Sequence, residues 1–258
     1  MNKLNITLAL LLLASCAEQT IAPKVSKAEL EDEKRYQHDM VKVNKIAAYT
    51  EAPKITEKMK QRFANVVNVV GVAGEDLCHQ LQKKKCNFDF QLEEDKALNA
   101  FADGKKIVIN TAMMDFASKD EELANVVSHE YAHNIMRHVE SAQGNMWIGL
   151  LAGLAIDTAL GTGSTVTEFG AKTGAASYSV DFEKEADYVG LYIFARTGYD
   201  PNQAIEFWRK MSYANESAID TGVTHPTNPE RFVAMKKTIA EITYKHNNGL
   251  PLIPELKD

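Results

Sequence analysis

Alternating apolar and polar residues mark a short strand region between two helical regions. Phe88, Phe90 and Leu92 alternate with polar residues, which is the pattern of a half-buried strand. Residues 99–102 and 106–110 flank the dipeptide Asp103-Gly104, a turn sequence that predicts a β-hairpin. The pattern therefore predicts a small sheet within residues 88–110.

The rest of the chain shows mostly helical spacing. Residues 54–70 predict an amphipathic helix with apolar positions Ile55, Met59, Phe63, Val66, Val67 and Val70. After the strands, Gly198 ends one predicted helix, Asp200-Pro201 begins the next, and Asn228-Pro229 begins a last one that reaches about Tyr244. These elements predict an α+β fold, mostly helical, with the sheet placed before a set of helices.

The sequence leaves the role of two segments open. Residues 27–48 are highly charged and lack a clear apolar face, so we expect a solvated helix or a linker that carries no chemistry. Residues 146–160 are apolar except for Asp157 and Thr158, yet this run is too short to span a bilayer. A buried or surface-lying helix fits the run, and so does a mobile element covering a cleft, because glycines are concentrated in residues 144–174.

Composition narrows the class of protein. The 258-residue chain is 45% hydrophobic and 25% charged, which excludes a disordered or collagen-like chain. A formal charge of -6, without a cluster of basic residues interleaved with aromatics, argues against a nucleic acid partner. No repeat of 30 to 50 residues is visible, which excludes a helical solenoid domain.

The first residues have the pattern of a secretion signal. Lys3 precedes an apolar run over residues 6–14, and Leu13-Ala14-Ser15-Cys16 resembles the lipobox of bacterial lipoproteins. The resemblance implies cleavage before Cys16 and its lipidation; an ordinary secretory signal is the alternative. Because Ala17 and Glu18 lack the aspartate that commonly retains lipoproteins in the inner membrane, we expect the periplasmic side of the outer membrane.

These signals divide the chain into four parts. We expect a signal peptide over residues 1–15, a lipidated tether and charged helix over 16–50, one domain over 51–245 and a tail over 246–258. In an oxidising compartment, Cys78 and Cys86 form an even pair, which favours a structural disulfide. Two reduced thiols are the alternative, and a metal site of Cys78, His79 and Cys86 lacks a fourth ligand.

The sequence Ser128-His129-Glu130-Tyr131-Ala132-His133 carries the chemistry. At 3.6 residues per turn, His129 and His133 lie one above the other on a helix and can bind one metal ion. Glu130 is turned by about 100° and can act as a base without being a ligand. Ser118 and Glu121 predict a capping box at the start of this helix.

A third ligand is needed, because catalytic zinc commonly has three protein ligands. In the helix expected to begin near Asp181, Glu183 and Asp187 are four residues apart and share a face. Glu183 can therefore complete the site, while Asp187 can accept the second ring N–H of a ligand histidine.

Together these residues resemble the zinc metallopeptidase family that includes the CAAX prenyl protease, HtpX and BepA. The similarity covers about residues 55–240, including the strand pair before the zinc helix and the pair His225-Pro226 followed by Arg231. The resemblance implies a zincin-type metallopeptidase fold with one Zn²⁺ per chain. The chain lacks the spanning helices of the first two members and the repeat domain of BepA, and is most similar to small single-domain lipoprotein members.

The resemblance also implies a role for each residue. His129, His133 and Glu183 hold zinc, Glu130 is the general base and then acid, and Asp187 orients a ligand. His225 faces the zinc, either stabilising the oxyanion or occupying the water position in a latent state; a packed loop histidine is the alternative. Arg231 is expected to pair with a local carboxylate. Substrate is expected to pair with an exposed strand edge formed by Asn99, Ala100, Phe101 and Ala102.

These roles predict a zinc-dependent endopeptidase, lipid-anchored in the bacterial envelope, that cleaves unfolded or misassembled envelope proteins. Its expected partners are protein substrates, the membrane at Cys16 and the envelope assembly machinery. The alternative is a chaperone-like assembly factor with a latched or structural zinc site. The presence of Glu130 favours the enzyme, because structural zinc has no need of a base. A structural lipoprotein without bound zinc is the weakest hypothesis.

Overall fold

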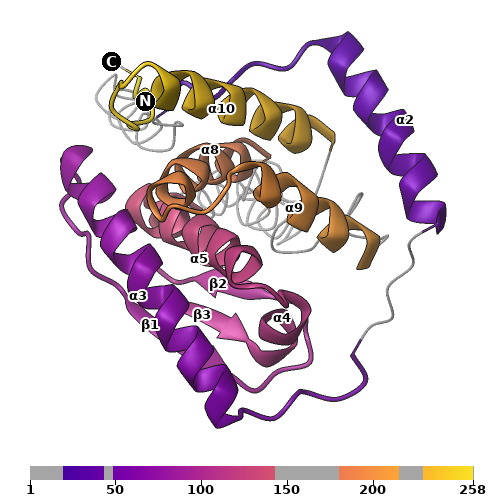
Figure 1. Cartoon of the computed structure of the whole chain (residues 1–258), viewed down its shortest axis with the longest axis vertical. Helices are drawn as coiled ribbons and strands as arrows, with labels where there is room; N and C mark the ends of the chain where they lie inside the picture. The colour runs from indigo at the N-terminus through magenta and orange to yellow at the C-terminus, as the bar shows by residue number, and fades with distance from the viewer. Residues whose placement is uncertain (1–19, 44–48, 143–179, 215–228, 258) are drawn as a thin grey trace, which may run out of the picture.

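The expected α+β fold is confirmed in a computed structural model, which describes residues 20–43, 49–142, 180–214 and 229–257 (Figure 1). The described helices are α2 (Lys27–Val43), α3 (Glu57–Gln80), α4 (Thr111–Phe116), α5 (Asp120–Ile135), α8 (Val180–Arg196), α9 (Asn202–Ala214) and α10 (Pro229–Asn247). The strands are β1 (Asp89–Glu93), β2 (Ala100–Ala102) and β3 (Lys106–Asn110). Cys16, residues 144–174 and His225 lie outside the described residues, so the expectations for them stay predictions.

The sheet has the strand order β1-β3-β2. β1 is parallel to β3, and β2 is antiparallel to it, so the predicted hairpin is confirmed. Its turn uses Gly104 at φ +86°, a conformation that favours glycine, and Asp103 Oδ1 accepts the backbone N–H groups of Lys105 and Lys106 at 2.8 Å each. Side chains at alternate positions, such as Ile107 and Ile109, share the face that packs on the helices.

The helix before the sheet begins later and runs much further than the expected range 54–70. Thr56 caps its start, where the hydroxyl oxygen accepts the backbone N–H of Met59 at 3.2 Å. The helix continues through Gly71 and Gly74, which local propensity would place near an end. Both glycines face aromatic rings, Phe90 and Tyr131 respectively, so their lack of a side chain permits close packing. Tertiary contact therefore outweighs propensity here.

The start of α5 differs from the predicted capping box. The capping residue is Lys119, and Glu122 reaches back to its backbone N–H at 3.2 Å. The expected pair Ser118 and Glu121 is therefore wrong by one residue; Ser118 instead contacts the Glu122 carboxylate. The helix ends at Ile135, and Arg137 has φ +61° and turns the chain.

α5 and α8 form the centre of the fold (Figure 1). α3 and the sheet pack against α5, and α10 packs against α8. Every α5 residue from Leu123 to Ile135 is buried. At Gly190 in α8, an added Cβ would lie 3.1 Å from His129 Cα, so the two helix backbones come unusually close. This contact places the segment from His129 to His133 directly against α8, the helix that carries Glu183 and Asp187.

The charged segment is attached to the domain rather than solvated on all sides. It forms α2, in which Glu33 is buried and pairs with Arg209 in α9 at 3.4 Å and with Lys236 in α10 at 2.7 Å. Further outward, Glu29 pairs with Lys237 at 2.9 Å. The expected helix is confirmed, but it is not solvated all round. The buried contacts of Glu33 are ionic, so the sequence shows no apolar stripe.

Two links tie distant segments together. Cys78 and Cys86 form a disulfide that joins the end of α3 to the chain before β1, with Cα atoms 5.5 Å apart. Thr20 pairs with Leu256, and the Ile21 N–H donates to the Glu255 carbonyl oxygen at 2.9 Å. The segment after the expected anchor therefore lies beside the last described residues.

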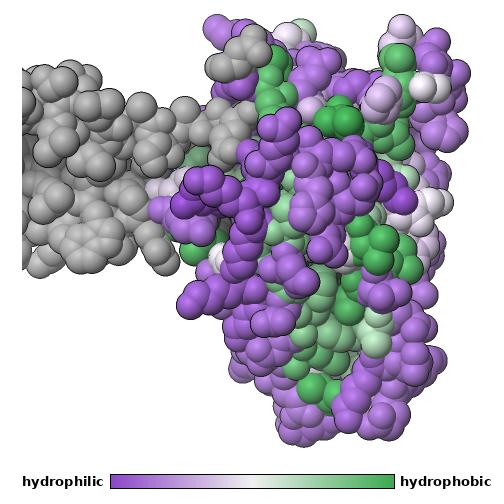
Figure 2. Space-filling model, turned by 90° about the vertical axis from the view of Figure 1, so that its left-hand side faces the viewer, coloured by the Kyte–Doolittle hydropathy of each residue, from purple (hydrophilic) through white to green (hydrophobic). Residues whose placement is uncertain are grey.

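The face of the molecule in Figure 2 is largely hydrophilic. Figure 2 shows separate hydrophobic areas between hydrophilic side chains on one face. Among the described helices, none has an apolar stretch of the length that crossing a membrane requires.

The two glycines of α3 give a matched test of the packing. Gly74→Ala should lower the free energy of unfolding by about 1–3 kcal/mol, because its Cβ would lie 2.7 Å from the buried Tyr131 ring. That ring is held by its hydroxyl, which donates to the Cys86 carbonyl oxygen. Gly71→Ala meets its nearest atom at 3.4 Å and gains helix propensity of up to about 1 kcal/mol. Urea unfolding of both variants measures the difference; equal destabilisation would contradict it.

Candidate metal centre

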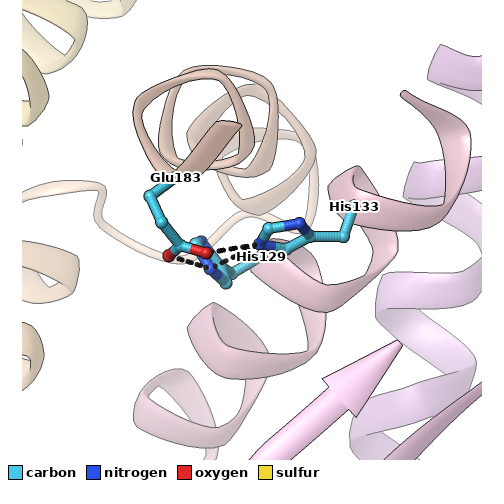
Figure 3. A group of neighbouring side chains, drawn as sticks. All are labelled: His129, His133 and Glu183. Carbon is cyan, nitrogen blue, oxygen red and sulfur yellow. Dashed lines mark hydrogen bonds and ion pairs between the residues drawn. The ribbon is translucent and has the colours of Figure 1, made fainter. Parts of the chain in front are cut away.

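Three buried side chains from α5 and α8 point toward one another (Figure 3). The Nε2 atoms of His129 and His133 are 3.1 Å apart, as expected for residues one turn apart on α5. Glu183 reaches across from the first turn of α8, with Oε2 3.3 Å from His129 Nε2 and Oε1 3.3 Å from His133 Nε2. The structure therefore brings together the three expected ligands.

The donor set fits a metal ion. Among the described residues, His129, His133 and Glu183 are the group whose ligand atoms converge, all within 4.8 Å of one another. A tetrahedral Zn²⁺ with bonds of about 2.0–2.1 Å separates its ligand atoms by about 3.3 Å, close to the separations found here. Two imidazoles and one carboxylate are also a common catalytic zinc set.

Asp187 lies where the sequence placed it, next to the other nitrogen of His129. Its Oδ1 is 3.1 Å from His129 Nδ1. An N–H at Nδ1 that donates to this carboxylate leaves the lone pair of Nε2 directed at the metal position. The geometry is that of a carboxylate that fixes the tautomer of a ligand histidine.

Arg231 has a larger part than the pairing expected from sequence. Its Nε and Nη2 donate to Asp187 at 2.7 and 2.8 Å, and its Nη1 lies 2.8 Å from Glu183 Oε2. The guanidinium is 1% exposed. One side chain from α10 therefore holds both acidic residues of α8 in place.

The buried charges favour a cation at the centre. Burial lowers the pKa of Arg231, but Asp187, Glu183 and Glu130 outweigh it and raise that pKa well above its ordinary value. Burial likewise lowers the pKa of His129, whereas Asp187 and Glu183 raise it to about 9. Three carboxylates therefore face one guanidinium and the proton that His129 holds without metal, and a bound divalent cation would take the place of that proton.

Glu130 follows His129 on α5 and is 1% exposed. Its position on the helix turns it by about 100° from His129, which keeps it near the centre but outside the converging trio. A buried carboxylate next to a proposed ligand on the helix fits the expected general base, which stays a prediction.

Sequence reasoning missed four residues around the centre. Trp208 of α9 covers it, with its ring 5.0 Å from the His129 ring and 5.4 Å from the Arg231 guanidinium carbon. Gly190 allows the helix contact, while His138 and Glu185 lie on the far side of His133. No sequence pattern marks Trp208. Glu185 is marked only by its place, as an acidic residue between Glu183 and Asp187.

Comparison with known proteins identifies the family. The profile of peptidase family M48 matches residues 65–239. The chain belongs to peptidase family M48. The membership confirms the resemblance that His129, His133 and Glu183 indicated.

Relatives of this M48 chain are found in bacteria and mitochondria. It is 27% identical over 173 residues to the beta-barrel assembly-enhancing protease of Yersinia pestis, covering 62% of this chain and 34% of the relative. It is 32% identical over 137 residues to the mitochondrial metalloendopeptidase OMA1 of Arabidopsis thaliana, covering 52% and 28%. The chain thus spans about a third of the length of these relatives.

Removal of Arg231 should destabilise the metal-free protein. Arg231→Met leaves Glu183 and Asp187 buried without their cation, so the free energy of unfolding should fall by about 3–5 kcal/mol. Arg231→Lys keeps the charge but not the two-pronged geometry, so its loss should be smaller but measurable. Denaturant unfolding in the presence of a chelator measures both. Stability of Arg231→Met equal to that of the wild type would contradict the assignment.

Proposed function

We propose that this M48 chain is a zinc-dependent endopeptidase, anchored in the bacterial envelope by a lipid at Cys16, that hydrolyses unfolded or misassembled envelope proteins. The observation that carries the proposal is the convergence of His129, His133 and Glu183 beside the buried Glu130. Family membership and relatives named as metalloendopeptidases support it.

The chemistry follows from the residues. A zinc ion held by the trio would act as a Lewis acid, polarising the scissile carbonyl and acidifying water. Glu130 takes the proton of the attacking water and passes it to the leaving amine nitrogen. Asp187 and Arg231 keep His129 and Glu183 in position throughout.

The edge of the sheet offers a place for substrate. β2 is an edge strand, and hydrogen bonds from Asn110 N–H to Asn99 O and from Asp103 N–H to Lys106 O fix its register. In that register Ala100 and Ala102 lie in the non-hydrogen-bonded pairs, so their backbone N–H and C=O groups point away from β3. Ala100 and Ala102 are only 2% and 8% exposed, so the expected exposed edge is covered here. An extended substrate could pair with these groups as a further strand only after the covering groups move aside.

Strand pairing fits the proposed substrate class. It recognises the peptide backbone more than the side chains, and only an unfolded or loosely folded segment exposes its backbone in this way. The relative from Yersinia pestis is named for enhancing β-barrel assembly, which supports envelope proteins as substrates and the assembly machinery as a partner.

The second candidate is a chaperone-like assembly factor whose zinc site is latched. The same named relative favours a link to assembly. In this hypothesis His225 occupies the water position at rest; in the enzyme hypothesis it stabilises the oxyanion or swings away as substrate enters. A buried carboxylate at residue 130 supports catalysis over a purely structural zinc site.

Glu130→Gln should keep zinc but lose proteolysis, because it removes the base and leaves all three ligands. Casein digestion measures activity, and atomic absorption measures zinc bound per chain. His129→Ala is the matched variant that should lose both zinc and activity, together with the stability that bound metal provides. Cleavage by Glu130→Gln at the wild-type rate would refute the assignment of Glu130 as the base. Absence of chelator-sensitive cleavage by the wild type would favour the assembly factor.

Lipidation can be tested separately from catalysis. Bacteria expressing the full chain and fed radioactive palmitate should label the wild type but not Cys16→Ser, because the sulfur atom of Cys16 is the proposed attachment point of the lipid. Cys78→Ser is the control and should still be labelled. Label in Cys16→Ser would refute anchoring at that residue.

A further inference from the structure

A second histidine lies against the outer nitrogen of a proposed metal ligand. His133 Nδ1 and His138 Nδ1 are 3.0 Å apart, and both rings are buried. Since His133 Nε2 belongs to the converging trio, its ring can present a lone pair there only if Nδ1 carries the hydrogen. That N–H then donates to His138, whose Nδ1 must be the acceptor.

The chain of hydrogen bonds ends on a carboxylate. His138 Nε2 is 2.8 Å from Glu185 Oε2, so the His138 ring, with its hydrogen at Nε2, donates to Glu185. Glu185 is 1% exposed, and its other carboxylate oxygen accepts from a backbone N–H. Because a carboxylate oxygen accepts hydrogen bonds, Glu185 sets the direction of every hydrogen bond back to His133.

The first described residue of the chain completes this arrangement. The Thr20 backbone N–H donates to Glu185 Oε1 at 2.6 Å. Thr20 is buried and held by its pairing with Leu256. The segment that follows the proposed lipid anchor therefore touches the support of the metal centre.

Regular helix geometry would not produce these contacts. On a continuous helix, His138 would be turned by about 140° from His133. α5 instead ends at Ile135, and Arg137 adopts φ +61°, which brings His138 back over His133. Phe182 stacks on the His138 ring at 4.6 Å and fixes its plane. A non-glycine residue in this conformation is strained and persists where the surrounding structure requires it.

We infer that His138 and Glu185 are positioning residues that fix the tautomer and orientation of the ligand His133, and that the Thr20 backbone completes their support. The two proposed ligand histidines are then supported differently: His129 directly by Asp187, and His133 by Glu185 through a second ring. The inference deepens the proposed zinc site and rests on it.

The test measures zinc affinity of the full chain by competition with a chromophoric chelator. His138→Leu should weaken zinc binding about 10- to 100-fold, because it leaves the His133 N–H without an acceptor. His138→Asn, whose side-chain oxygen can take the place of Nδ1, should stay within about threefold of the wild type. The visible spectrum of the cobalt(II)-loaded protein should change in His138→Leu and not in His138→Asn.

A matched control separates positioning from stability. Ile135→Ala removes buried side-chain volume from the same helix, so it should lower stability while the folded protein keeps wild-type zinc affinity and the wild-type cobalt spectrum. An affinity loss in this control equal to that of His138→Leu would overturn the inference. So would wild-type affinity in His138→Leu, or an equal loss in His138→Asn.

The Thr20 contact has its own pair of variants. Thr20→Pro lacks the backbone N–H and should weaken zinc binding. Thr20→Ala keeps the backbone N–H and should bind zinc as tightly as the wild type. Equal affinities would remove Thr20 from the arrangement. Zinc affinity is measured without substrate, so a loss of affinity in His138→Leu would support the inference even if the wild type cleaved no protein. Absence of cleavage by the wild type would refute only the proposed function.

Discussion

The metal centre depends on how closely the backbones of α5 and α8 approach each other. At Gly190 a side chain would be crowded, because an added Cβ would lie 3.1–3.2 Å from backbone atoms of Ser128 and His129. This approach puts the first turn of α8 opposite His129 and His133. It also buries Glu183, whose carboxylate then reaches both histidines at 3.3 Å. A wider helix separation would keep every residue of the motif but separate its ligand atoms.

Burial at this contact makes charge balance the next constraint. Glu183 and Asp187 are removed from water, and the Arg231 guanidinium of α10 offsets part of their charge. The remaining negative charge favours a bound cation, while the hydrogen bonds to Asp187 and Arg231 fix where it can bind. The same residues thus contribute to folding and to metal selection, which links α10 to a site built on α5 and α8.

Much of the site was predictable because helix periodicity is local. The four-residue spacings of His129 with His133 and of Glu183 with Asp187 place each pair on one helix face, as found. The hairpin followed from Asp103-Gly104. Helix limits were less accurate: α3 passes through Gly71 and Gly74, and α5 is capped at Lys119, because contacts with Tyr131 and Glu122 outweigh local preference. The buried Glu33 of α2 makes ion pairs, so the sequence of this helix shows no apolar pattern that would predict its packing.

The sequence by itself determined which residue types could bind metal, the helical phase that pairs them, the position of the hairpin and the family. Tertiary structure decided which distant residues complete the centre: Trp208 over the rings, Arg231 across two carboxylates, and the contacts from His133 through His138 to Glu185. The physical reason is that helix phase depends only on residue spacing along one segment. Contacts between segments depend on where a chain turns, as at Arg137, and on how closely two backbones can pack, as at Gly190.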